Sequence, residues 1–213
     1  MLESGNLLNF VILSFWSIFV IVDPIGSVPT FLAMTERDTP EARVRTAKLA
    51  SLITFFVLVS FSLGGKWILN IFGISLSAFK VAGGIVLLKV ALDMLQAKQT
   101  AIKETPEEKA EGATKDDIAI TPLAVPILAG PGAITAVVLL TSQAADFVQH
   151  GIILSNIFLV SVIVFFTLRT AALRSSIFSA ITLKIIARLM GLLLAAVATQ
   201  FILDGIRDVT NLW

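Results

Sequence analysis

The sequence lacks cysteine and has a single histidine, and each shortage excludes a class of function. Without cysteine the chain can form no disulfide and can carry out no thiol chemistry. With His150 as the one histidine, a hydrolytic zinc centre would lack its usual imidazole ligands. We expect His150 to be a bystander in a loop. The formal net charge of +1 gives no indication of a nucleic-acid partner. The sequence therefore predicts neither a metal site nor a cofactor.

Charged residues are also scarce. They make up 15% of the 213 residues, whereas a soluble domain has roughly 25%, and hydrophobic residues reach 56%. Several windows of about 18 or more residues contain almost no charge, which is typical of transmembrane helices. The segments of alternating polarity that a transmembrane barrel needs are absent. The first apolar segment has no basic region before it and is too long for a signal peptide's core, so we expect it in the mature protein. These features predict an all-α integral membrane protein.

The apolar segments predict six transmembrane helices, and a polar linker divides them into two sets of three. The linker, residues 97–117, combines Pro, Gly and mixed charge and is predicted to be a cytoplasmic loop. Residues 66–77 are apolar but short and contain glycine, so we expect them to be interfacial or re-entrant. The expected organisation is a first three-helix repeat (1–96), the linker (97–117) and a second three-helix repeat (118–213). The six spans are expected near residues 7–34, 44–65, 78–95, 118–142, 151–169 and 184–206.

The positions of Lys and Arg predict the orientation of the chain in the membrane. With six spans, the three connections that would face one side carry most of the basic residues, and such connections are usually cytoplasmic. Both termini are therefore predicted to lie on the non-cytoplasmic side. The basic residues of these connections are Arg37, Arg43, Arg45, Lys48, Lys98, Lys103, Lys109, Lys115, Arg169, Arg174, Lys184 and Arg188.

The two sets of spans show weak self-similarity. A shift of 107 residues places Pro24 on Pro131, within "DPIGSVP" and "AGPGAIT". A shift of 108 places "KVAGGIVLL" on "RLMGLLLAA", with Gly83 over Gly191. Because each set has three spans, an odd number, the second set must insert upside down. The sequence thus predicts two inverted three-helix repeats, an architecture typical of secondary transporters.

Two spans in matching positions contain proline and glycine near their middles. The first contains "VDPIGSVPTF" (22–31), and the fourth contains "TPLAVPILAGPGAIT" (121–135). Such residues interrupt the helical hydrogen bonds, and free backbone groups are tolerated in a membrane only where protein, water or a ligand satisfies them. Helices 1 and 4 are therefore predicted to be discontinuous. The alternative is that these residues only kink the helices and permit close packing.

Two helix interruptions at mid-membrane could form a substrate site. A helix N-terminus presents unpaired N–H groups and a partial positive charge, which suit a carboxylate. Carbonyl groups near Val22 and Ala129 could accept hydrogen bonds from an ammonium group. Together they suit a zwitterionic amino acid, and the glycine-rich walls leave space only for a small one. The predicted substrate-binding residues are Asp23, Pro24, Ile25, Gly26, Ser27, Ala129, Gly130, Pro131, Gly132 and Ala133.

Other intramembrane polar residues have less specific interpretations. Asp23 could take up and release a proton during transport, or could cap a helix by accepting from the amides near Gly26 and Ser27. Lys89 and Asp93 are four residues apart and are predicted to form a structural ion pair. Of the polar residues in the last span, Asp204 and Arg207 are expected at the interface, and Thr199 and Gln200 could line a path.

The stretches "DPIGSVP", "PLAVPILAGPGAI" and "RLMGLLLAAVATQFILDGIRD" resemble the signature stretches of the MarC family of inner-membrane proteins. The resemblance covers residues 7–208 apart from the linker. It implies a six-span protein of the plasma (inner) membrane of a prokaryote, with interruptions in helices 1 and 4. For characterised members it implies transport of glycine and alanine, coupled to the proton gradient. By motif position it marks Asp23, Pro24, Gly26, Pro29, Gly130 and Pro131.

The favoured hypothesis is a secondary transporter of small neutral amino acids, glycine and alanine, coupled to protons or to sodium. The alternatives are a channel, in which the interruptions form a constriction, and an exporter of another small solute. An intramembrane aspartyl protease would need a second carboxylate opposed to Asp23, and Asp93, with Lys89 as its neighbour, is the only other acid well inside a span. We therefore expect no enzymatic activity. The expected partners are the substrate, the coupling ion and membrane lipid, and the sequence does not reveal an oligomeric state.

Overall fold

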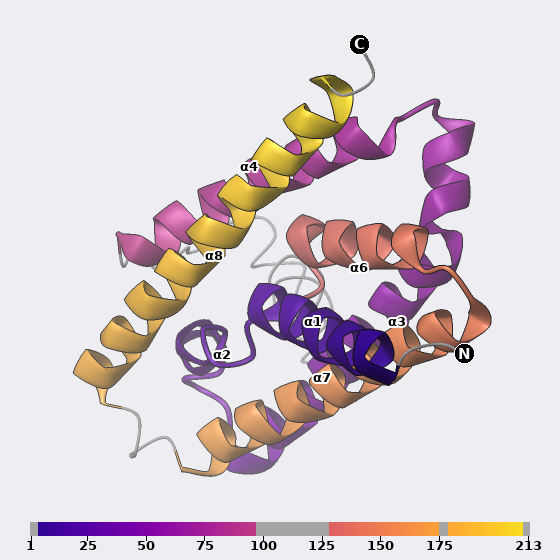
Figure 1. The fold of residues 1–213 in the computed structure, drawn as a ribbon. Helices are drawn as coiled ribbons and strands as arrows, with labels where there is room; N and C mark the ends of the chain where they lie inside the picture. Colours follow the sequence, from indigo (N-terminus) through magenta and orange to yellow (C-terminus); the bar gives the residue numbers. More distant parts are fainter. Residues whose placement is uncertain (1–3, 97–127, 175–178, 211–213) are drawn as a thin grey trace.

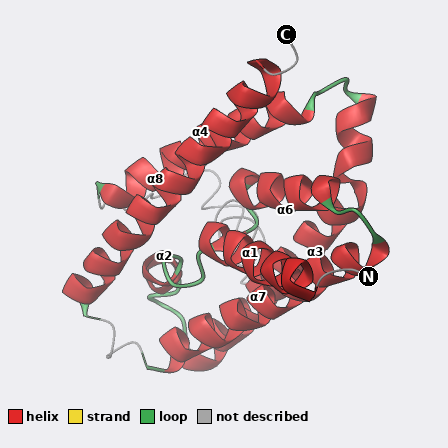
Figure 2. Cartoon of the chain, viewed as in Figure 1, coloured by secondary structure: helices red, strands yellow, loops and turns green. Residues whose placement is uncertain are grey.

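The computed structural model describes residues 4–96, 128–174 and 179–210, and these residues form helices joined by short turns, with no strand among them (Figures 1 and 2). The polar linker lies outside the described residues. The all-α class predicted from the sequence is confirmed for the described part. Its helices are α1 (Ser4–Val22), α2 (Val28–Met34), α3 (Pro40–Ile71), α4 (Leu76–Leu95), α6 (Pro131–Gln143), α7 (Phe147–Leu173) and α8 (Ala180–Thr210).

Three of these helices are long and apolar enough to cross a membrane: α3, α7 and residues Ile181–Thr210 of α8. The apolar helical segments Leu7–Val22 and Pro131–Gln143 are shorter. The remaining long helix, α4, carries Lys80, Lys89 and Asp93 among its 20 residues. An integral membrane protein is thus supported by three helices of the described part.

Residues 66–71 are not a re-entrant segment but the end of α3, whereas the interfacial position expected for residues 66–77 stays a prediction. α3 continues through Ile71 without a break, and only the four residues 72–75 separate it from α4. Gly64 and Gly65, which directly precede this segment, do not end the helix. Gly65 instead packs against Val138 of α6. The turn that does end α3 contains Gly73 in the left-handed region, with φ of +65°.

Side-chain caps fix the starts of three long helices. The Thr39 hydroxyl accepts from the Ala42 amide at 3.3 Å, and Pro40 occupies the first turn of α3. Asp146 caps α7 through the Gln149 amide at 2.8 Å. Ser75 caps α4 through the Ala78 amide at 3.1 Å. These caps satisfy donors that the first helical turn leaves unpaired, so the helix starts are set by local sequence.

The helices are arranged as two long pairs with shorter helices between them. α4 lies alongside α8, and α3 lies alongside α7, while α1, α2 and α6 occupy the space between these pairs (Figure 1). Buried polar contacts join the central helices to the second pair. The Asn156 side chain on α7 donates to the Ser14 hydroxyl on α1 at 2.8 Å, and the hydroxyls of Ser62 on α3 and Thr141 on α6 lie 2.9 Å apart.

Small residues allow α4 and α8 to approach each other closely. A Cβ atom added at Gly84 would lie 2.8 Å from the Ala198 carbonyl oxygen, one at Gly191 would lie 3.0 Å from that of Ala91, and one at Gly205 would lie 2.9 Å from that of Ser77. The contacts recur every seven residues and run in opposite directions along the two helices, so the helices are antiparallel. We call these six positions the small-residue seam: Ser77, Gly84 and Ala91 of α4, and Gly191, Ala198 and Gly205 of α8. Such residues let helix backbones pack closely, and the resulting van der Waals contact stabilises helix pairs in membranes.

Candidate functional site

The chain leaves the helical path between α1 and α2. Asp23 has φ of +48°, in the left-handed region that aspartate tolerates better than most residues. Pro24 follows and has no amide hydrogen with which to continue the helix. The Asp23 amide still donates to the Phe19 carbonyl at 3.0 Å, so the helical pattern stops immediately after it.

The amides of this turn are satisfied by the turn itself. The Gly26 amide donates to Asp23 Oδ1 at 2.9 Å, and the Ser27 amide donates to the Asp23 carbonyl oxygen at 3.1 Å. The Ser27 hydroxyl donates to the Pro24 carbonyl at 2.8 Å. The capping role considered for Asp23 is therefore present at Gly26. The expectation that unpaired amides near Gly26 and Ser27 would face a guest was wrong, because the Asp23 side chain and carbonyl already pair them.

The start of α6 is different. Gly130 precedes the helix with an extended backbone and has no side chain to cap it, and Pro131 occupies the first turn. The first internal bond is donated by the Ile134 amide to the Gly130 carbonyl at 3.0 Å. The amides of Gly132 and Ala133 precede that bond, at positions where an α-helix has no internal acceptor. This helix start can therefore donate to a carboxylate.

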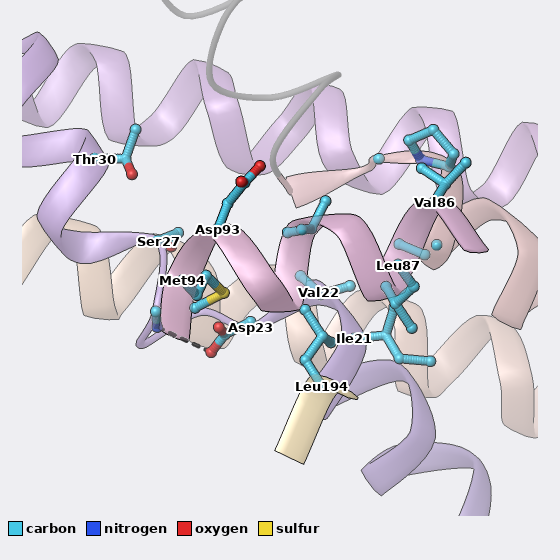
Figure 3. Close-up of a pocket in the computed structure, with 16 residues that line it drawn as sticks. Ile21, Val22, Asp23, Ser27, Thr30, Val86, Leu87, Asp93, Met94 and Leu194 are labelled. Carbon is cyan, nitrogen blue, oxygen red and sulfur yellow. Dashed lines mark hydrogen bonds between the residues drawn. The ribbon is translucent and has the colours of Figure 1, made fainter. Parts of the chain in front are cut away.

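A cavity of about 170 Å³ lies between the α1–α2 turn, the start of α6 and one face of α4 (Figure 3). Figure 3 shows Asp23 on the turn, with its hydrogen bond from Gly26, and Asp93 on α4. The cavity wall is mainly apolar, with two carboxylates and two hydroxyls. Its lining residues are Ile21, Val22, Asp23, Gly26, Ser27, Thr30, Val86, Leu87, Val90, Asp93, Met94, Gly130, Pro131, Gly132, Ala133 and Leu194.

The cavity brings together most of the substrate-binding residues predicted from the sequence. Those that line it are Asp23, Gly26, Ser27, Gly130, Pro131, Gly132 and Ala133. The other three do not line it: Pro24 and Ala129 are buried elsewhere, and Ile25 is 38% exposed. Gly132 is also a packing position, because a Cβ atom there would meet the Leu87 side chain. No group of three or more potential metal ligands occurs among the described residues.

Sequence reasoning missed the contribution of α4. Val86, Val90, Asp93 and Met94 recur at helical spacing and form one face, and that periodicity could have been noticed. The predicted ion pair between Lys89 and Asp93 is wrong for this structure. No salt bridge joins these two described residues, since Lys89 is exposed while Asp93 lines the cavity. The ion pair that α4 does form runs from Lys80 to Asp208 of α8, with a separation of 2.6 Å.

The other polar residues weighed in the sequence lie away from the cavity. Thr199 and Gln200 are exposed on α8, so they do not line the cavity in this structure, although the glycine face of that helix is packed. Gln200 donates to Asp204 at 2.8 Å instead. His150 lies in the first turn of α7 rather than in a loop, and its Nδ1 is 2.8 Å from the Asp146 carbonyl oxygen.

Comparison with known proteins places this sequence in a family. Residues 8–210 match the family model described as "MarC family integral membrane protein". A UPF0056 membrane protein of Methanocaldococcus jannaschii is 41% identical over 201 residues, which cover 94% of this chain and 97% of that protein. The UPF0056 membrane protein YvbG of Bacillus subtilis is 35% identical over 94% of this chain and 96% of its own.

The similarity extends to further bacteria. YhcE of Escherichia coli, also described as a UPF0056 membrane protein, is 33% identical over 92% of this chain and 91% of its own length. No solved structure matches the chain. Because the family model covers nearly all of the sequence and the relatives match along their whole lengths, the chain belongs to the MarC family of integral membrane proteins.

Proposed function

We propose that this protein is a secondary transporter of small neutral amino acids, such as glycine and alanine, with the substrate held in the cavity described above. One observation carries the proposal. A single small cavity combines the open N-terminus of α6 with two carboxylates, Asp23 and Asp93, from two other elements. A zwitterion needs donors at one end and acceptors at the other, and this cavity offers both.

The size of the cavity suits such a substrate. An engineered protein cavity of about 150 Å³ binds benzene, which has six heavy atoms. Alanine also has six heavy atoms, and glycine has five. The volume here is about 170 Å³, well below the several hundred Å³ of sites for drug-sized ligands. The cavity therefore favours a substrate with hydrogen or a methyl group as its side chain.

The charged groups suggest a pose for the substrate. Its carboxylate would accept from the amides of Gly132 and Ala133, where the α6 dipole is favourable. Its ammonium group would donate to Asp93 on the α4 wall. Asp23, whose Oδ1 already accepts from Gly26, has a second oxygen that could bind and release the coupling proton, or bind sodium.

We further propose that the chain is built from two inverted repeats related by a shift of 107 residues. Several local features support this shift: the helix caps Thr39 and Asp146, and the seam glycines Gly84 and Gly191, differ by that number. The glycine of α4 that faces α8 is Gly84, whereas Gly83 faces Thr135 of α6. The match of Gly83 with Gly191, at a shift of 108, is therefore replaced by the match of Gly84 with Gly191.

Two of the three seam contacts support this proposal, because they are related as an inverted repeat would relate them. A Cβ atom at Gly84 would approach the Ala198 carbonyl oxygen and, at 3.1 Å, the amide nitrogen four residues further on. A Cβ atom at Gly191 would approach the Ala91 carbonyl oxygen and, at 3.2 Å, the amide nitrogen four residues further on. Because Ala91 and Ala198 also differ by 107, the shift converts one contact into the other. We infer that the two-fold axis passes between them and relates six spans, with helices 1 and 4 interrupted and both termini non-cytoplasmic.

The same two carboxylates also permit a second candidate function, that of an intramembrane aspartyl protease. Asp93, which was predicted to pair with Lys89, lines the same cavity as Asp23, although Figure 3 shows its carboxylate pointing away from Asp23. A cavity of about 170 Å³ is too small for an extended polypeptide segment, since even drug-sized ligands need about 300 Å³ or more. We therefore favour transport, and cleavage of a model transmembrane peptide that Asp93→Asn abolishes would reverse that choice.

Uptake of radiolabelled glycine and alanine into proteoliposomes tests the transporter proposal. A pH gradient and a sodium gradient should be imposed separately on the wild type and on Asp23→Asn. We expect one gradient to drive saturable accumulation in the wild type, and Asp23→Asn to lose that accumulation while keeping exchange of substrate. If neither gradient drives accumulation, coupled transport is contradicted. Flux that is fast but never saturates would indicate a channel.

A further inference from the structure

Of the two helices α4 and α8, which the proposed repeat relates to each other, α4 provides most of the cavity wall. The face of α4 that lines it contains Val86, Val90 and Asp93, whereas α8 contributes only Leu194. The shift of 107 residues relates Leu87 of α4 to Leu194 of α8, and both line the cavity, next to the proposed two-fold axis. The face of α8 that corresponds to the cavity face of α4 is therefore defined, although Leu194 is the only residue of α8 that lines the cavity described above.

Six consecutive corresponding positions of the two helices have the same burial, whereas Val90 is exposed and Val197 half-buried, and Asp93 is half-buried and Gln200 exposed. Residues 84–89 are in turn buried, exposed, exposed, buried, half-buried and exposed, and residues 191–196 repeat that order. With the shift of 107 residues, Val90 corresponds to Val197, and Asp93 corresponds to Gln200. Val197 and the neighbouring Phe201 are half-buried and pack against the core, as Met94 of α4 does. The α8 face thus packs in part against the buried core.

We propose that this face of α8 lines a second cavity in the opposite-facing state of the transporter, with Gln200 in the place that Asp93 has here. The inference rests on the proposed function, since it assumes that the protein alternates between two states. Exchange of the two repeats would preserve the two central contacts of the small-residue seam, Gly84 with Ala198 and Gly191 with Ala91, because these two map onto each other. After the exchange, the central helices α1, α2 and α6 would pack on α8 instead of on α4.

The exchange has a chemical consequence for the substrate. In the structure described, the α4 wall of the cavity offers a carboxylate, Asp93, and in the exchanged state the α8 wall would offer the amide of Gln200. Hydrogen bonds to a charged acceptor are roughly twice as strong as those between neutral groups. An ammonium group would therefore be held more weakly in the second cavity. For its amide to reach that cavity, Gln200 must also release Asp204, to which it now donates at 2.8 Å.

The absence of cysteine makes the chain suitable for a direct test. Single variants Val90→Cys and Val197→Cys, in proteoliposomes, are treated with a membrane-impermeant thiol reagent applied to one side at a time. We expect Val90→Cys to react from one side and Val197→Cys to react from the other. Because a minor state is typically populated at 10% or less, the residue that is accessible only in that state should react at least about tenfold more slowly than the other. A condition that raises the rate at one residue should lower it at the other.

Leu92→Cys and Thr199→Cys are matched controls. They differ by 107 residues, are exposed, and lie outside the cavity face of each helix, so neither should show a change of side. Reaction of Val90→Cys and Val197→Cys from the same side, or rates that rise and fall together, would overturn the inference. The result separates this inference from the substrate proposal. Labelling from opposite sides without glycine uptake would support the second cavity and exclude glycine as the substrate. Glycine uptake with labelling from the same side would support glycine as the substrate and exclude the second cavity.

Discussion

Glycine residues have different roles in the α4–α8 pair and in the region between the α1–α2 turn and α6. In the seam, glycines remove side chains so that two backbones touch, and carbonyl oxygens stand about 3 Å from where a Cβ atom would be. In the central region, glycine and proline interrupt helices, and the space beside them is a cavity with two carboxylates. The comparison teaches that glycine content alone does not identify a site. What matters is whether the space that glycine leaves is filled by backbone or left open.

The seam should be the part of the molecule that tolerates change least. Gly84→Leu would drive a branched side chain against the Ala198 carbonyl oxygen and the Ile202 amide, and backbone atoms cannot move aside as a flexible side chain can. Overpacking of a well-packed interior typically costs about 1–3 kcal/mol and occasionally more. We expect Gly84→Leu to yield little folded protein, measured as the monodisperse fraction in detergent. Gly84→Ala should fold but should melt at a lower temperature.

Gly64 provides the control for this first prediction. A Cβ atom there would meet nothing within 4 Å, and alanine is about 1 kcal/mol better than glycine in a helix interior. Gly64→Ala should therefore leave the melting temperature unchanged or raise it slightly. Equal melting temperatures for Gly84→Ala and Gly64→Ala would mean that the seam does not have the close contact described here.

In the cavity the largest effect should be on substrate affinity rather than on folding. Asp93→Asn removes a charged acceptor, and hydrogen bonds to charged groups contribute about 1.5–3 kcal/mol. That range corresponds to a loss of roughly tenfold to 100-fold in apparent affinity for glycine, measured by competition or by concentration-dependent uptake. Lys89→Gln is the matched control on the same helix, because Lys89 is exposed and does not line the cavity. Similar losses in both variants would support a functional ion pair between the two residues and would contradict the site proposed here.

Asp23 allows backbone conformation to be separated from charge. Asparagine tolerates the left-handed region and can still accept from the Gly26 amide, whereas alanine does neither well. A left-handed alanine costs about 1–2 kcal/mol. We expect Asp23→Ala to lower the melting temperature clearly and Asp23→Asn to lower it little, although both lose gradient-driven accumulation. A stable Asp23→Ala variant would mean that the turn is not held by this residue.

Local signals in the sequence predicted the features that local chemistry decides. Pro24 and Pro131 marked the end of α1 and the start of α6, because proline acts on its own turn of helix. The helical class followed from composition. The cavity face of α4 was not predicted, because it depends on which side of α4 packs on α8, more than 100 residues away in the chain. Adjacent glycines, Gly83 and Gly84, gave no means of deciding which one faces that helix.

The same limit explains two further differences. α3 continues past Gly65, and the face of that glycine packs against Val138, a residue of the second half of the chain that local sequence cannot reveal. The pairing of Lys80 with Asp208 depends on the antiparallel seam, and neither residue has its partner within four positions of it. Helix-spacing rules find only neighbours on one helix, which is why they suggested Lys89 with Asp93.

The smallest effect is expected at the end of the seam, where Lys80 meets Asp208. The Lys80 side chain is only 11% exposed, whereas that of Asp208 is 45% exposed, so the two partners are not equivalent. Removing the charge of Asp208 leaves a largely buried ammonium group without its partner, while replacing Lys80 leaves an accessible carboxylate that water can solvate. We expect Asp208→Asn to lower the melting temperature more than Lys80→Met does, and the double variant to resemble Lys80→Met. Because one partner is accessible, the coupling measured by a double-mutant cycle should be about 1 kcal/mol or less and should fall with added salt. A coupling as large as the effect of Gly84→Ala would mean that the ion pair, rather than close backbone contact, holds α4 against α8.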